Sequence, residues 1–443
     1  MKTFKAGGVH PPENKFSADA AIEILPIPKR AYVLTSQHLG IPATILVKRG
    51  DDVKTGQLIA KSSGFISANI HSPVTGKVFK IEDVIDQSGY KRPAIIIDTT
   101  EDIWEDGIEP SDKIEREITL SREEIIKRIN ELGVVGLGGA TFPTHIKMMI
   151  PEGKNAELLI INGVECEPYL TSDHRLMLEK GEQILIGTAI LMKALGVSKA
   201  MIGIENNKPD AIAHLSILSE GFKGISVHAL KVKYPQGGEK QLIKALTGRE
   251  VPSGKLPIET GCVVNNVGTA FAVYEAVQKR KPLIERVVTV TGKAAKKPSN
   301  FMVRIGTPIS ELIEKAGGIH ENLGKVISGG PMMGKALTSP EVPVLKGTSG
   351  ILLMLKEESA REKISNCIRC AKCISVCPMG LEPYLLEKLT FIENYEQAES
   401  QRILDCMECG SCHYTCPAGR PLLDYIRLGK SKVSFLVRNR KKQ

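Results

Sequence analysis

The amino-acid sequence predicts a multidomain α/β protein, and three features of the chain support this fold class. Residues 31–100 contain short alternating β-runs separated by polar, glycine-containing turns, which is typical of a small antiparallel β domain. Residues 115–285 alternate apolar strand-like segments with amphipathic helical ones, a pattern that favours a largely parallel sheet. Towards the C-terminus, two groups of cysteines with metal-ligand spacing indicate a separate metal-binding domain.

The composition fits an ordinary globular protein. The 443 residues are 42% hydrophobic and 25% charged, which suffices for the cores of several domains. Aromatic residues make up only 5%, and the net charge of +9 comes without a nucleic-acid-binding motif, so we expect no nucleic-acid partner. No run of about 18 apolar residues is present, and the first residues lack the apolar core of a signal peptide, which predicts a cytoplasmic protein without a membrane span.

The first hundred residues divide into an extension and a β domain. Residues 1–30 carry four prolines and are expected to form a loosely packed N-terminal extension. In residues 31–100, the stretches GDDVKTGQLIA and SPVTGKV resemble the barrel sandwich of biotinyl and lipoyl domains. The stretch that would form the hairpin tip, 62–65, is Ser-Ser-Gly-Phe and has no modifiable lysine, so we expect a structural role.

A charged linker over 101–120 leads into the α/β region of residues 115–285. Ser121 and Glu124 form the S-x-x-E capping box of a helix that ends at Gly133. Strands are predicted at 157–162, 200–205 and 225–232, and helices at 173–196, 208–219, 238–247 and 268–279. Residues 286–345 follow as a small domain, in which VVTVTG predicts a strand, GTPISELIEKAGG a helix and KVISGGPMMG a glycine-rich return.

Residues 358–429 hold two copies of one cysteine motif, C-x2-C-x2-C-x3-C-P, 39 residues apart. Thiolates at every third residue of a tight loop can reach three corners of one cubane, and the fourth cysteine ligates the other cluster in two-cluster ferredoxins. Zinc is the alternative, but it gains nothing from the proline after the fourth cysteine. The spacing therefore predicts two [4Fe–4S] clusters, one on Cys367, Cys370, Cys373 and Cys416 and the other on Cys406, Cys409, Cys412 and Cys377. Outside the motifs, Cys166 and Cys262 are expected to be buried apolar thiols.

Four glycine- and asparagine-rich segments indicate a ligand site in the α/β region. GLGGATFPT at 136–144 follows a helix and so is not a Rossmann fingerprint, but its glycines would let the backbone approach a planar ring or a phosphate. NGVECEP at 162–168 ends a strand, where α/β folds bind ligands. YPQGGE at 234–239 opens a helix, which suits an anion, and VVNNV at 263–267 supplies two amides.

Together these segments resemble the flavin- and NADH-binding subunit of respiratory complex I, over residues 130–345. The domain at 286–345 resembles a soluble-ligand-binding β-grasp domain. With the opening FKAGGVHPPENK, the barrel sandwich and the ferredoxin-type repeat, the whole chain resembles the RnfC subunit of the Rnf complex, a membrane-bound ferredoxin:NAD oxidoreductase coupled to ion transport. The implied fold has a barrel-sandwich β domain, an α/β flavin/NAD domain, a β-grasp-like small domain and a two-cluster ferredoxin-like α domain.

The resemblance implies particular cofactor contacts. The glycine loop against FMN, a basic residue near its phosphate and polar contacts to the flavin are matched by Gly136, Gly138, Gly139, Lys147, Asn162, Asn265 and Asn266. Positions that face the nucleotide are matched by Phe142, Glu165, Glu167 and Glu239. The chain departs from complex I at Val164 and Gly238, where that family has Asp and Glu, and in carrying two clusters rather than one.

The chemistry that the resemblance implies is hydride exchange with NAD(H) through FMN and relay of single electrons through the clusters, with no side chain acting as general base. The implied partners are the other subunits of the membrane complex, with ferredoxin reached through one of them. The implied location is the cytoplasmic face of the membrane, as a peripheral subunit. The alternatives are the NAD-reactive flavin subunit of a soluble hydrogenase or formate dehydrogenase, which usually lacks a barrel sandwich, and a non-enzymatic ferredoxin-like relay or scaffold.

Residues 430–443 form a basic tail without acidic residues. Its six positive charges are Lys430, Lys432, Arg438, Arg440, Lys441 and Lys442. A charge run of this kind is usually a solvated end, but in a peripheral subunit it could attract an anionic membrane surface or an acidic partner subunit. Phe435, Leu436 and Val437 would add a short apolar contact.

Overall fold

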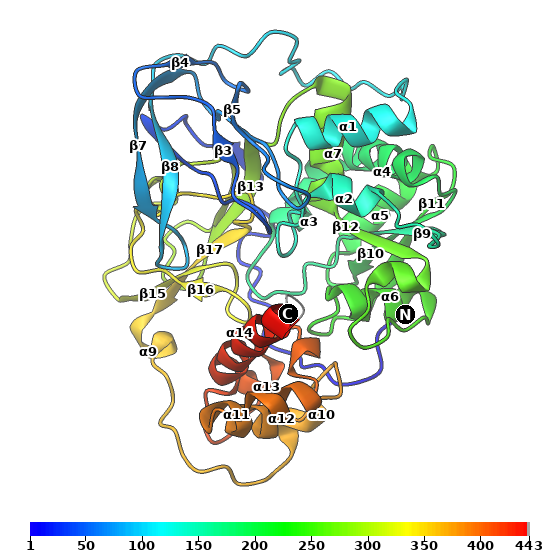
Figure 1. Cartoon of the computed structure of the whole chain (residues 1–443), viewed down its shortest axis with the longest axis vertical. Coiled ribbons are helices and arrows are strands. Elements are labelled where there is room, and N and C mark those ends of the chain that lie inside the picture. The colour runs from blue at the N-terminus through cyan, green and yellow to red at the C-terminus, as the bar shows by residue number, and fades with distance from the viewer. Residues whose placement is uncertain (441–443) are drawn as a thin grey trace.

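The computed structural model describes residues 1–440. In Figure 1 the β domain lies at the upper left, the α/β domain at the right, and the C-terminal helices form the lower end of the molecule. The small domain's sheet lies below the β domain on the left. The cysteine-bearing helices are thus a separate body that contacts the rest of the chain from below.

The α/β domain is built on a four-stranded sheet in the order β11–β10–β9–β12, in which every pairing is parallel. Its strands are β9 (Leu158–Asn162), β10 (Ala200–Glu205), β11 (Ile225–Leu230) and β12 (Cys262–Asn266). Its helices are α1 (Arg122–Glu131), α2 (Thr144–Met148), α3 (Ser172–Glu179), α4 (Gly181–Leu195), α5 (Pro209–Ser219), α6 (Glu239–Thr247) and α7 (Val267–Lys279). Since parallel strands end at one edge of the sheet, Asn162 and Asn266 lie in register there.

Most elements predicted for this domain are confirmed, including the capping box of α1. The single helix expected over 173–196 is wrong, because the chain forms two helices there. The backbone of Lys180 leaves the helical conformation (φ −130°, ψ 32°). Gly181 then starts α4 close to α5, where a Cβ would lie 2.9 Å from His214 Nε2.

The β domain consists of two small antiparallel sheets around one core, as the barrel-sandwich resemblance implied. One sheet contains β2 (Arg30–Leu34), β4 (Asp52–Val53), β7 (Gly76–Ile85) and β8 (Lys91–Thr99). The other contains β3 (Thr44–Ile45), β5 (Leu58–Lys61) and β6 (Ile70–His71). Inward-facing side chains such as Val33, Ile59 and Ile95 are almost fully buried and hold the sheets together.

The small domain is a mixed six-stranded sheet in the order β1–β14–β13–β17–β15–β16, with helix α8 (Ile309–Lys315). The strands are β1 (Ile22–Ile24), β13 (Glu285–Thr291), β14 (Ser299–Arg304), β15 (Leu323–Ser328), β16 (Lys335–Ala336) and β17 (Gly350–Leu355). Strand β17 lies beyond the predicted end of this domain at residue 345. It nevertheless belongs to the sheet, because it pairs with both β13 and β15.

The N-terminal extension is packed, so the expectation of a loose segment is wrong. Strand β1 completes the edge of the small domain's sheet by pairing with β14. Nearer the N-terminus, Lys2 bridges to Leu230 and Val9 to Tyr234, and Phe4 is only 3% exposed. The extension is ordered because its backbone adds pairing partners to the α/β domain and to the small domain.

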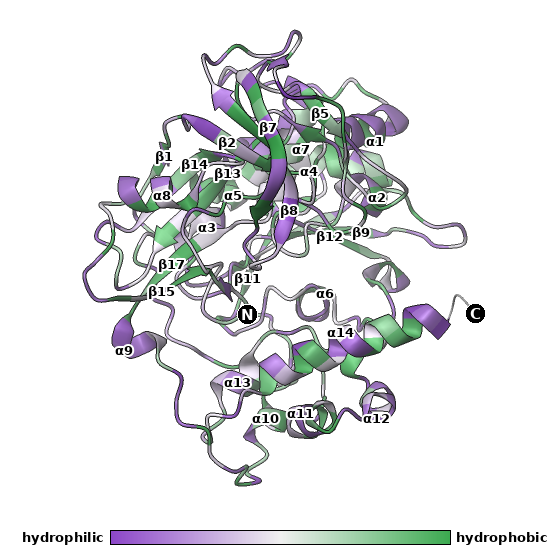
Figure 2. Ribbon diagram, turned by 60° about the vertical axis from the view of Figure 1, so that its left-hand side comes forward, coloured by the Kyte–Doolittle hydropathy of each residue, from purple (hydrophilic) through white to green (hydrophobic). Residues whose placement is uncertain are grey.

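The C-terminal domain is helical, and its last helix includes most of the predicted tail (Figure 2). Its helices are α10 (Lys372–Ser375), α11 (Pro383–Phe391), α12 (Tyr395–Ser400), α13 (Ser411–Tyr414) and α14 (Leu422–Arg440), while the short helix α9 (Lys356–Ser359) packs against β15 and β17 of the small domain. The predicted boundary between 429 and 430 falls inside α14, where Lys430 Nζ donates to Cys406 O at 2.6 Å and Val433 is fully buried. Residues 430–440 therefore belong to this domain, while Lys441 and Lys442 lie outside the described residues. Within residues 1–440, no helix has the length and apolar character needed to cross a membrane.

We expect Val433→Ala to destabilise the C-terminal domain, because burial of a valine side chain contributes about 2 kcal/mol. Phe435→Ala, two residues away at a side chain that is 58% exposed, is the matched control and should have almost no effect. The measurement is the temperature at which the visible absorbance of the iron–sulfur clusters bleaches. Equal bleaching temperatures for the two variants would contradict the packing of α14.

Candidate functional site

The glycine-rich loop lies beside the carboxyl edge of the parallel sheet. The Gly136 N–H donates to Phe142 O at 2.9 Å, which closes the loop, and the Phe142 side chain is half-buried. Gly138 stands against Asn266, since a Cβ on this glycine would lie 2.8 Å from Asn266 Nδ2. A Cβ on Gly139 would meet no protein atom within 4 Å. The loop therefore presents open backbone at the edge where the strands end.

The three predicted asparagines end the two strands nearest to this loop. Asn266 Nδ2 donates to Asp173 Oδ2 at 2.6 Å, and Asn162 Nδ2 donates to Gly237 O at 2.9 Å. Asn265 is 4% exposed, and its Nδ2 has no hydrogen-bond partner within residues 1–440. An unsatisfied buried amide costs about 1–3 kcal/mol, so this donor is suited to a bound ligand.

Two predicted charged residues face each other at the same edge. Lys147 Nζ lies 3.1 Å from Glu239 Oε1 and 2.9 Å from Val264 O. Lys147 lies on α2, directly after the glycine-rich loop, and Glu239 is the first residue of α6. The Lys147 side chain is 30% exposed. A phosphate could reach this ammonium group, in competition with the Glu239 carboxylate.

The predicted acids of the 162–168 segment have contacts that the sequence did not reveal. The Glu165 carboxylate accepts the N–H groups of Asp173 (2.7 Å) and His174 (3.1 Å) and so caps the start of α3. The Glu167 carboxylate accepts the N–H of Met332 at 2.7 Å, and burial raises its pKa. Both side chains fix neighbouring backbone rather than pointing freely towards the loop.

Sequence reasoning missed Asp173, whose carboxylate receives the Asn266 amide. Burial, and then the nearby charge of Glu165, raise the pKa of Asp173 to about 7. In the sequence this residue is one of the first-turn acids that helices commonly carry, so no motif distinguished it.

Sequence reasoning also missed two buried cations of the small domain that hold the glycine-rich loop. Arg286 Nη1 donates to Leu137 O at 3.4 Å, and Lys346 Nζ donates to Gly133 O at 2.7 Å. Burial lowers the pKa of Arg286 to about 10 and that of Lys346 to about 7. The β domain adds a backbone hydrogen bond of 3.2 Å from Leu39 to the loop. Three domains thus fix one loop.

The cysteines of the second motif line an enclosed cavity together with one cysteine of the first. Its lining includes Cys377, Cys406, Cys409 and Cys412. Apolar side chains such as Leu381 complete the wall. Burial raises the pKa of Cys406 to about 11 and raises that of Cys412 further. Free thiolates are thus disfavoured here, and a bound metal cluster would supply the missing positive charge.

The remaining cysteines lie on the outer side of the domain. Cys367 and Cys370 are exposed, whereas Cys373 and Cys416 are half-buried. The pKa of Cys373 is raised, first by burial and further by the charges of Cys416 and Cys367, so these thiols lie near one another. Cys377 of the first motif thus lies with three cysteines of the second, and Cys373 lies near Cys416, while the assignment of all eight cysteines to two clusters stays a prediction.

The enclosed cavity contacts the segment that opens α6. Tyr234 Oη donates to Cys409 O at 2.7 Å, and Gln241 Nε2 donates to Pro378 O at 3.3 Å. A Cβ on Gly238 would lie 2.5 Å from Met407 Cε. Residues 234–241 thus touch the cysteine cavity and also reach the strand ends through the contact between Asn162 and Gly237.

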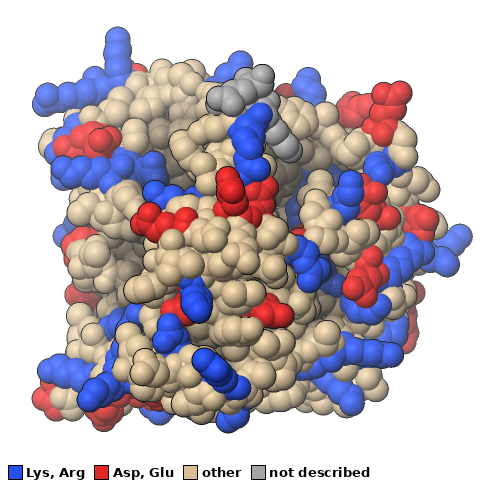
Figure 3. All heavy atoms as spheres, turned by 60° about the horizontal axis from the view of Figure 1, so that its bottom comes forward, with Lys and Arg blue, Asp and Glu red and all other residues tan. Residues whose placement is uncertain are grey.

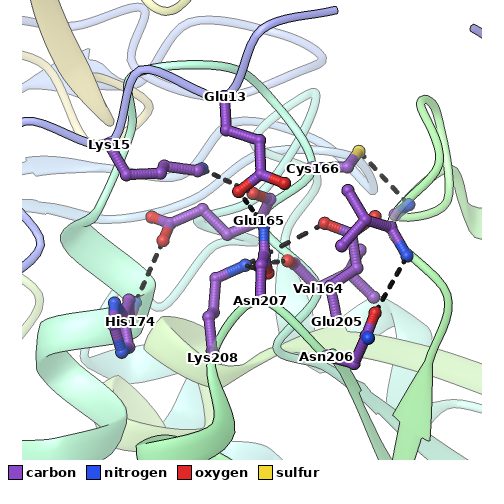
Figure 4. A network of polar contacts seen from close by, with 12 residues as sticks. Glu13, Lys15, Val164, Glu165, Cys166, His174, Glu205, Asn206, Asn207 and Lys208 are labelled. Atoms are coloured by element: carbon purple, nitrogen blue, oxygen red, sulfur yellow. Dashed lines mark hydrogen bonds and ion pairs between the residues drawn. The ribbon is translucent and has the colours of Figure 1, made fainter. Parts of the chain in front are cut away.

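Behind the strand ends, a buried polar network ties the N-terminal extension to the α/β domain (Figure 4). Lys15 Nζ donates to three carbonyls within residues 165–170, at 2.6 to 2.9 Å. Lys208 Nζ donates to Val164 O at 2.8 Å and lies 3.9 Å from Glu205 Oε2. Burial raises the pKa of Glu205 to about 7. The network fixes the turn that follows β9.

The two cysteines outside the motifs have different surroundings. Cys262 is fully buried among apolar side chains, as predicted. Cys166 is only half-buried, and its Sγ accepts the Gly237 N–H at 3.3 Å. Cys166 therefore makes a polar contact, and it helps to hold residues 234–241, the segment that contacts the cysteine cavity.

Four family models match successive parts of the chain. They are the RnfC barrel sandwich hybrid domain at residues 2–102, the Nuo51 FMN-binding domain at 129–275, the SLBB domain at 287–336 and the 4Fe-4S dicluster domain at 360–417. The matches follow the β domain, the α/β domain, the small domain and the cysteine-bearing domain in order.

Two relatives match over nearly their whole length. The chain is 48% identical to the C subunit of the proton-translocating ferredoxin:NAD⁺ oxidoreductase complex of Clostridium ljungdahlii, covering 97% of this chain and 94% of that protein. It is 44% identical to the C subunit of the Na⁺-translocating complex of Acetobacterium woodii, covering 97% of each. A solved structure of an NAD⁺-reducing [NiFe]-hydrogenase matches in fold, with a TM-score of 0.51, 18% identity, and 71% of this chain and 63% of that chain covered.

We expect Asp173→Asn to change how stability depends on pH. The folded protein holds a proton on Asp173 up to about pH 7, whereas an unfolded aspartate loses it near pH 3.9. Between these values the folded state binds more protons, so the free energy of unfolding of the wild type falls by about 1.4 kcal/mol per pH unit as pH rises to 7. Asp173→Asn has no carboxylate at this position, so its free energy of unfolding should lack this part of the pH dependence. Urea unfolding curves recorded by intrinsic fluorescence at several pH values measure how the free energy of unfolding of each protein depends on pH.

Asp106→Asn is the control for this experiment, because the Asp106 side chain is 93% exposed. Its stability should follow that of the wild type at every pH. A wild-type curve parallel to that of Asp173→Asn between pH 5 and 7 would show that Asp173 is ionised in the folded protein.

Proposed function

The chain belongs to the RnfC family, the C subunits of ion-translocating ferredoxin:NAD⁺ oxidoreductase complexes, and from its structure we propose that it exchanges hydride with NAD(H) at an FMN site and passes the electrons singly through two [4Fe–4S] clusters. The observation that carries this proposal is the position of the enclosed cysteine cavity. It lies against residues 234–241, which also reach the strand ends beside the glycine-rich loop. A site for hydride exchange and a site for one-electron transfer are thus neighbours within one chain.

The carboxyl edge of the sheet fits a flavin. Gly139 leaves space above the loop, Asn265 offers an unpartnered amide donor, and Lys147 offers a cation. The residues that we assign to FMN are Gly136, Gly138, Gly139, Lys147, Asn162, Asn265 and Asn266. When bound, FMN supplies the chemistry that links hydride exchange, which moves two electrons, to cluster transfer, which moves one. The side chains orient the ring and hold its phosphate.

We place NAD(H) on the same open face of the loop. Phe142 belongs to the loop and Glu239 contacts Lys147 directly after it, and both are half-buried, so they are available to a nucleotide. Glu165 and Glu167 act indirectly, since their carboxylates fix α3 and the backbone at Met332. No side chain has to remove a proton from the nicotinamide, because hydride leaves with its electron pair.

The two groups of cysteines fit crossed ligation. We assign one cluster to Cys367, Cys370, Cys373 and Cys416 and the other to Cys406, Cys409, Cys412 and Cys377. Cysteines from both motifs line one largely apolar cavity, which is the arrangement that shared ligation of a four-iron cubane requires and that a zinc site would not need. A cluster held by Cys406 would lie next to the α/β domain, and one held by Cys367 would lie at the exposed side of the C-terminal domain, so the first would be the nearer relay to the flavin site.

The family and its barrel sandwich favour this assignment over the NAD-reactive flavin subunit of a soluble hydrogenase or formate dehydrogenase. The unpartnered amide and the open loop argue against a relay or scaffold that has lost its flavin. The partners of the chain are the other subunits of the complex. We place it at the cytoplasmic face of the membrane as a peripheral subunit that reaches ferredoxin through one of them.

Gly139→Val should weaken FMN binding about tenfold, because a side chain forced into an occupied space costs about 1–3 kcal/mol. Without FMN the added side chain meets no protein atom nearby, so the fold should be unaffected. FMN content after dialysis is the measurement. Gly221→Val is the control, since this glycine is also exposed and its Cβ would have open space, with the nearest atom at 3.7 Å. Full FMN content in Gly139→Val would place the flavin elsewhere.

Cys377→Ala and Cys416→Ala should each damage the cluster of the other motif. In electron paramagnetic resonance spectra of the reduced protein, Cys377→Ala should lose the same signal as Cys406→Ala. Cys416→Ala should lose the same signal as Cys367→Ala. The reverse pairing would mean that each motif holds its own cluster.

A further inference from the structure

The two cysteine loops have the same backbone but opposite surroundings. Arg369 and Glu408 occupy equivalent positions with φ of 57° and 58°, and Ala371 and Gly410 follow with φ of 60° and 78°. The second loop is packed inside the protein, since a Cβ on Gly410 would lie 2.7 Å from Met332 O. The repeat therefore provides an internal comparison between a buried and an exposed copy of one structure.

The exposed copy has different residues between its cysteines. Met407 and Glu408 of the second loop correspond to Ile368 and Arg369 of the first, and Ser411 corresponds to Lys372. Glu408 is neutralised inside the protein by Lys430 at 2.9 Å, whereas Ile368 is 67% exposed. Where the second loop has residues that pack within the chain, the first loop has an exposed apolar side chain and two cations.

The sequence leading into the first loop continues this character. All of residues 361–370 are exposed, and Ile364 is 57% exposed. Residues 360–372 contain four basic side chains and one acidic one, Glu362, and one of the four, Arg361, pairs with Asp424 of α14 at 2.6 Å. We name this surface the first-cluster face and define it by Arg361, Lys363, Ile364, Ile368, Arg369 and Lys372. Figure 3 views the molecule from its lower end, where Lys and Arg side chains lie among uncharged side chains and several groups of Asp and Glu.

From these observations we propose that the first-cluster face docks an acidic surface of an electron-transfer subunit that carries its own one-electron centre beside the contact. The inference rests on the proposed function, which requires electrons to enter or leave the chain. Exposed apolar side chains surrounded by arginine and lysine are typical of protein interfaces, and complementary charge speeds the encounter. A lipid surface would satisfy the charges but could not accept electrons from the exposed cluster.

The transfer itself is simple in chemical terms. One electron passes from the reduced centre on one side of the contact to the oxidised centre on the other. No bond is made or broken, and no proton moves. The role of the face is therefore to bring the two centres close together, and Arg369 and Lys372 are positioning residues.

The test compares two reactions of the purified whole complex at low and high salt. Reduction of NAD⁺ by reduced ferredoxin needs the docked partner, whereas oxidation of NADH by a small soluble acceptor does not. Arg369→Glu combined with Lys372→Glu should slow the ferredoxin reaction about tenfold or more at low salt and abolish its salt dependence. It should leave the small-acceptor reaction and the iron and flavin contents unchanged. The matched control is Lys48→Glu with Arg49→Glu, an exposed Lys-Arg pair on the β domain with the same change of charge.

A second variant tests the apolar part separately. Ile364→Ser with Ile368→Ser should also slow the ferredoxin reaction while keeping its salt dependence. The proposal would be overturned if both variants reduced NAD⁺ with ferredoxin at the rate of the control. It would also be overturned if the substitutions changed the oligomeric state of the isolated protein, because the face would then be a contact between two copies of the chain. Absence of NADH oxidation in the wild type would instead count against the proposed function.

Discussion

The arrangement of the C-terminal domain depends on one exchange, in which the fourth cysteine of the first motif lies with the first three cysteines of the second. Cys377 lines the cavity of Cys406, Cys409 and Cys412, and Cys416 lies near Cys373. We propose that each loop takes its fourth ligand from beyond the other loop, which would hold the two loops back to back and their clusters close together. The domain also has two different sides. The cavity of the second motif contacts the α/β domain, whereas Cys367 and Cys370 of the first motif are exposed.

The ligand edge of the α/β domain is held by every other domain of the chain. Buried cations of the small domain donate to the glycine-rich loop, and the β domain adds a backbone hydrogen bond. The N-terminal extension joins the two redox regions directly, since Gly8 donates to Val376 O at 2.8 Å and Val9 pairs with Tyr234. Burying the charged groups of Lys346 and Arg286 costs free energy. Their hydrogen bonds to backbone carbonyls of the α/β domain offset part of this cost. The multidomain fold thus serves to position one loop and one cavity.

Local sequence signals predicted most of the elements and the cysteine-bearing domain, because these depend on spacing along the chain. The capping box at Ser121, the parallel strands and the cysteine repeat are all of this kind. The sequence could not reveal contacts made across domains. Asp173, Arg286 and Lys346 are ordinary charged residues until the fold buries them. The packing of the extension depends on partners more than two hundred residues away, such as Leu230 and Tyr234, and the burial of Val433 depends on side chains of other helices of its own domain.

The central claim is that a cluster on Cys377, Cys406, Cys409 and Cys412 lies between the flavin site and a second, exposed cluster. Anomalous diffraction at the iron edge from crystals of the FMN-loaded protein measures this directly. We expect two separate groups of iron atoms, one in the cavity beside Tyr234 and one at Cys367, Cys370, Cys373 and Cys416. We also expect electron density for the flavin at the carboxyl edge of the sheet, next to Gly139. Iron bound only within each motif, or an exposed cluster closer to the flavin than the enclosed one, would contradict it.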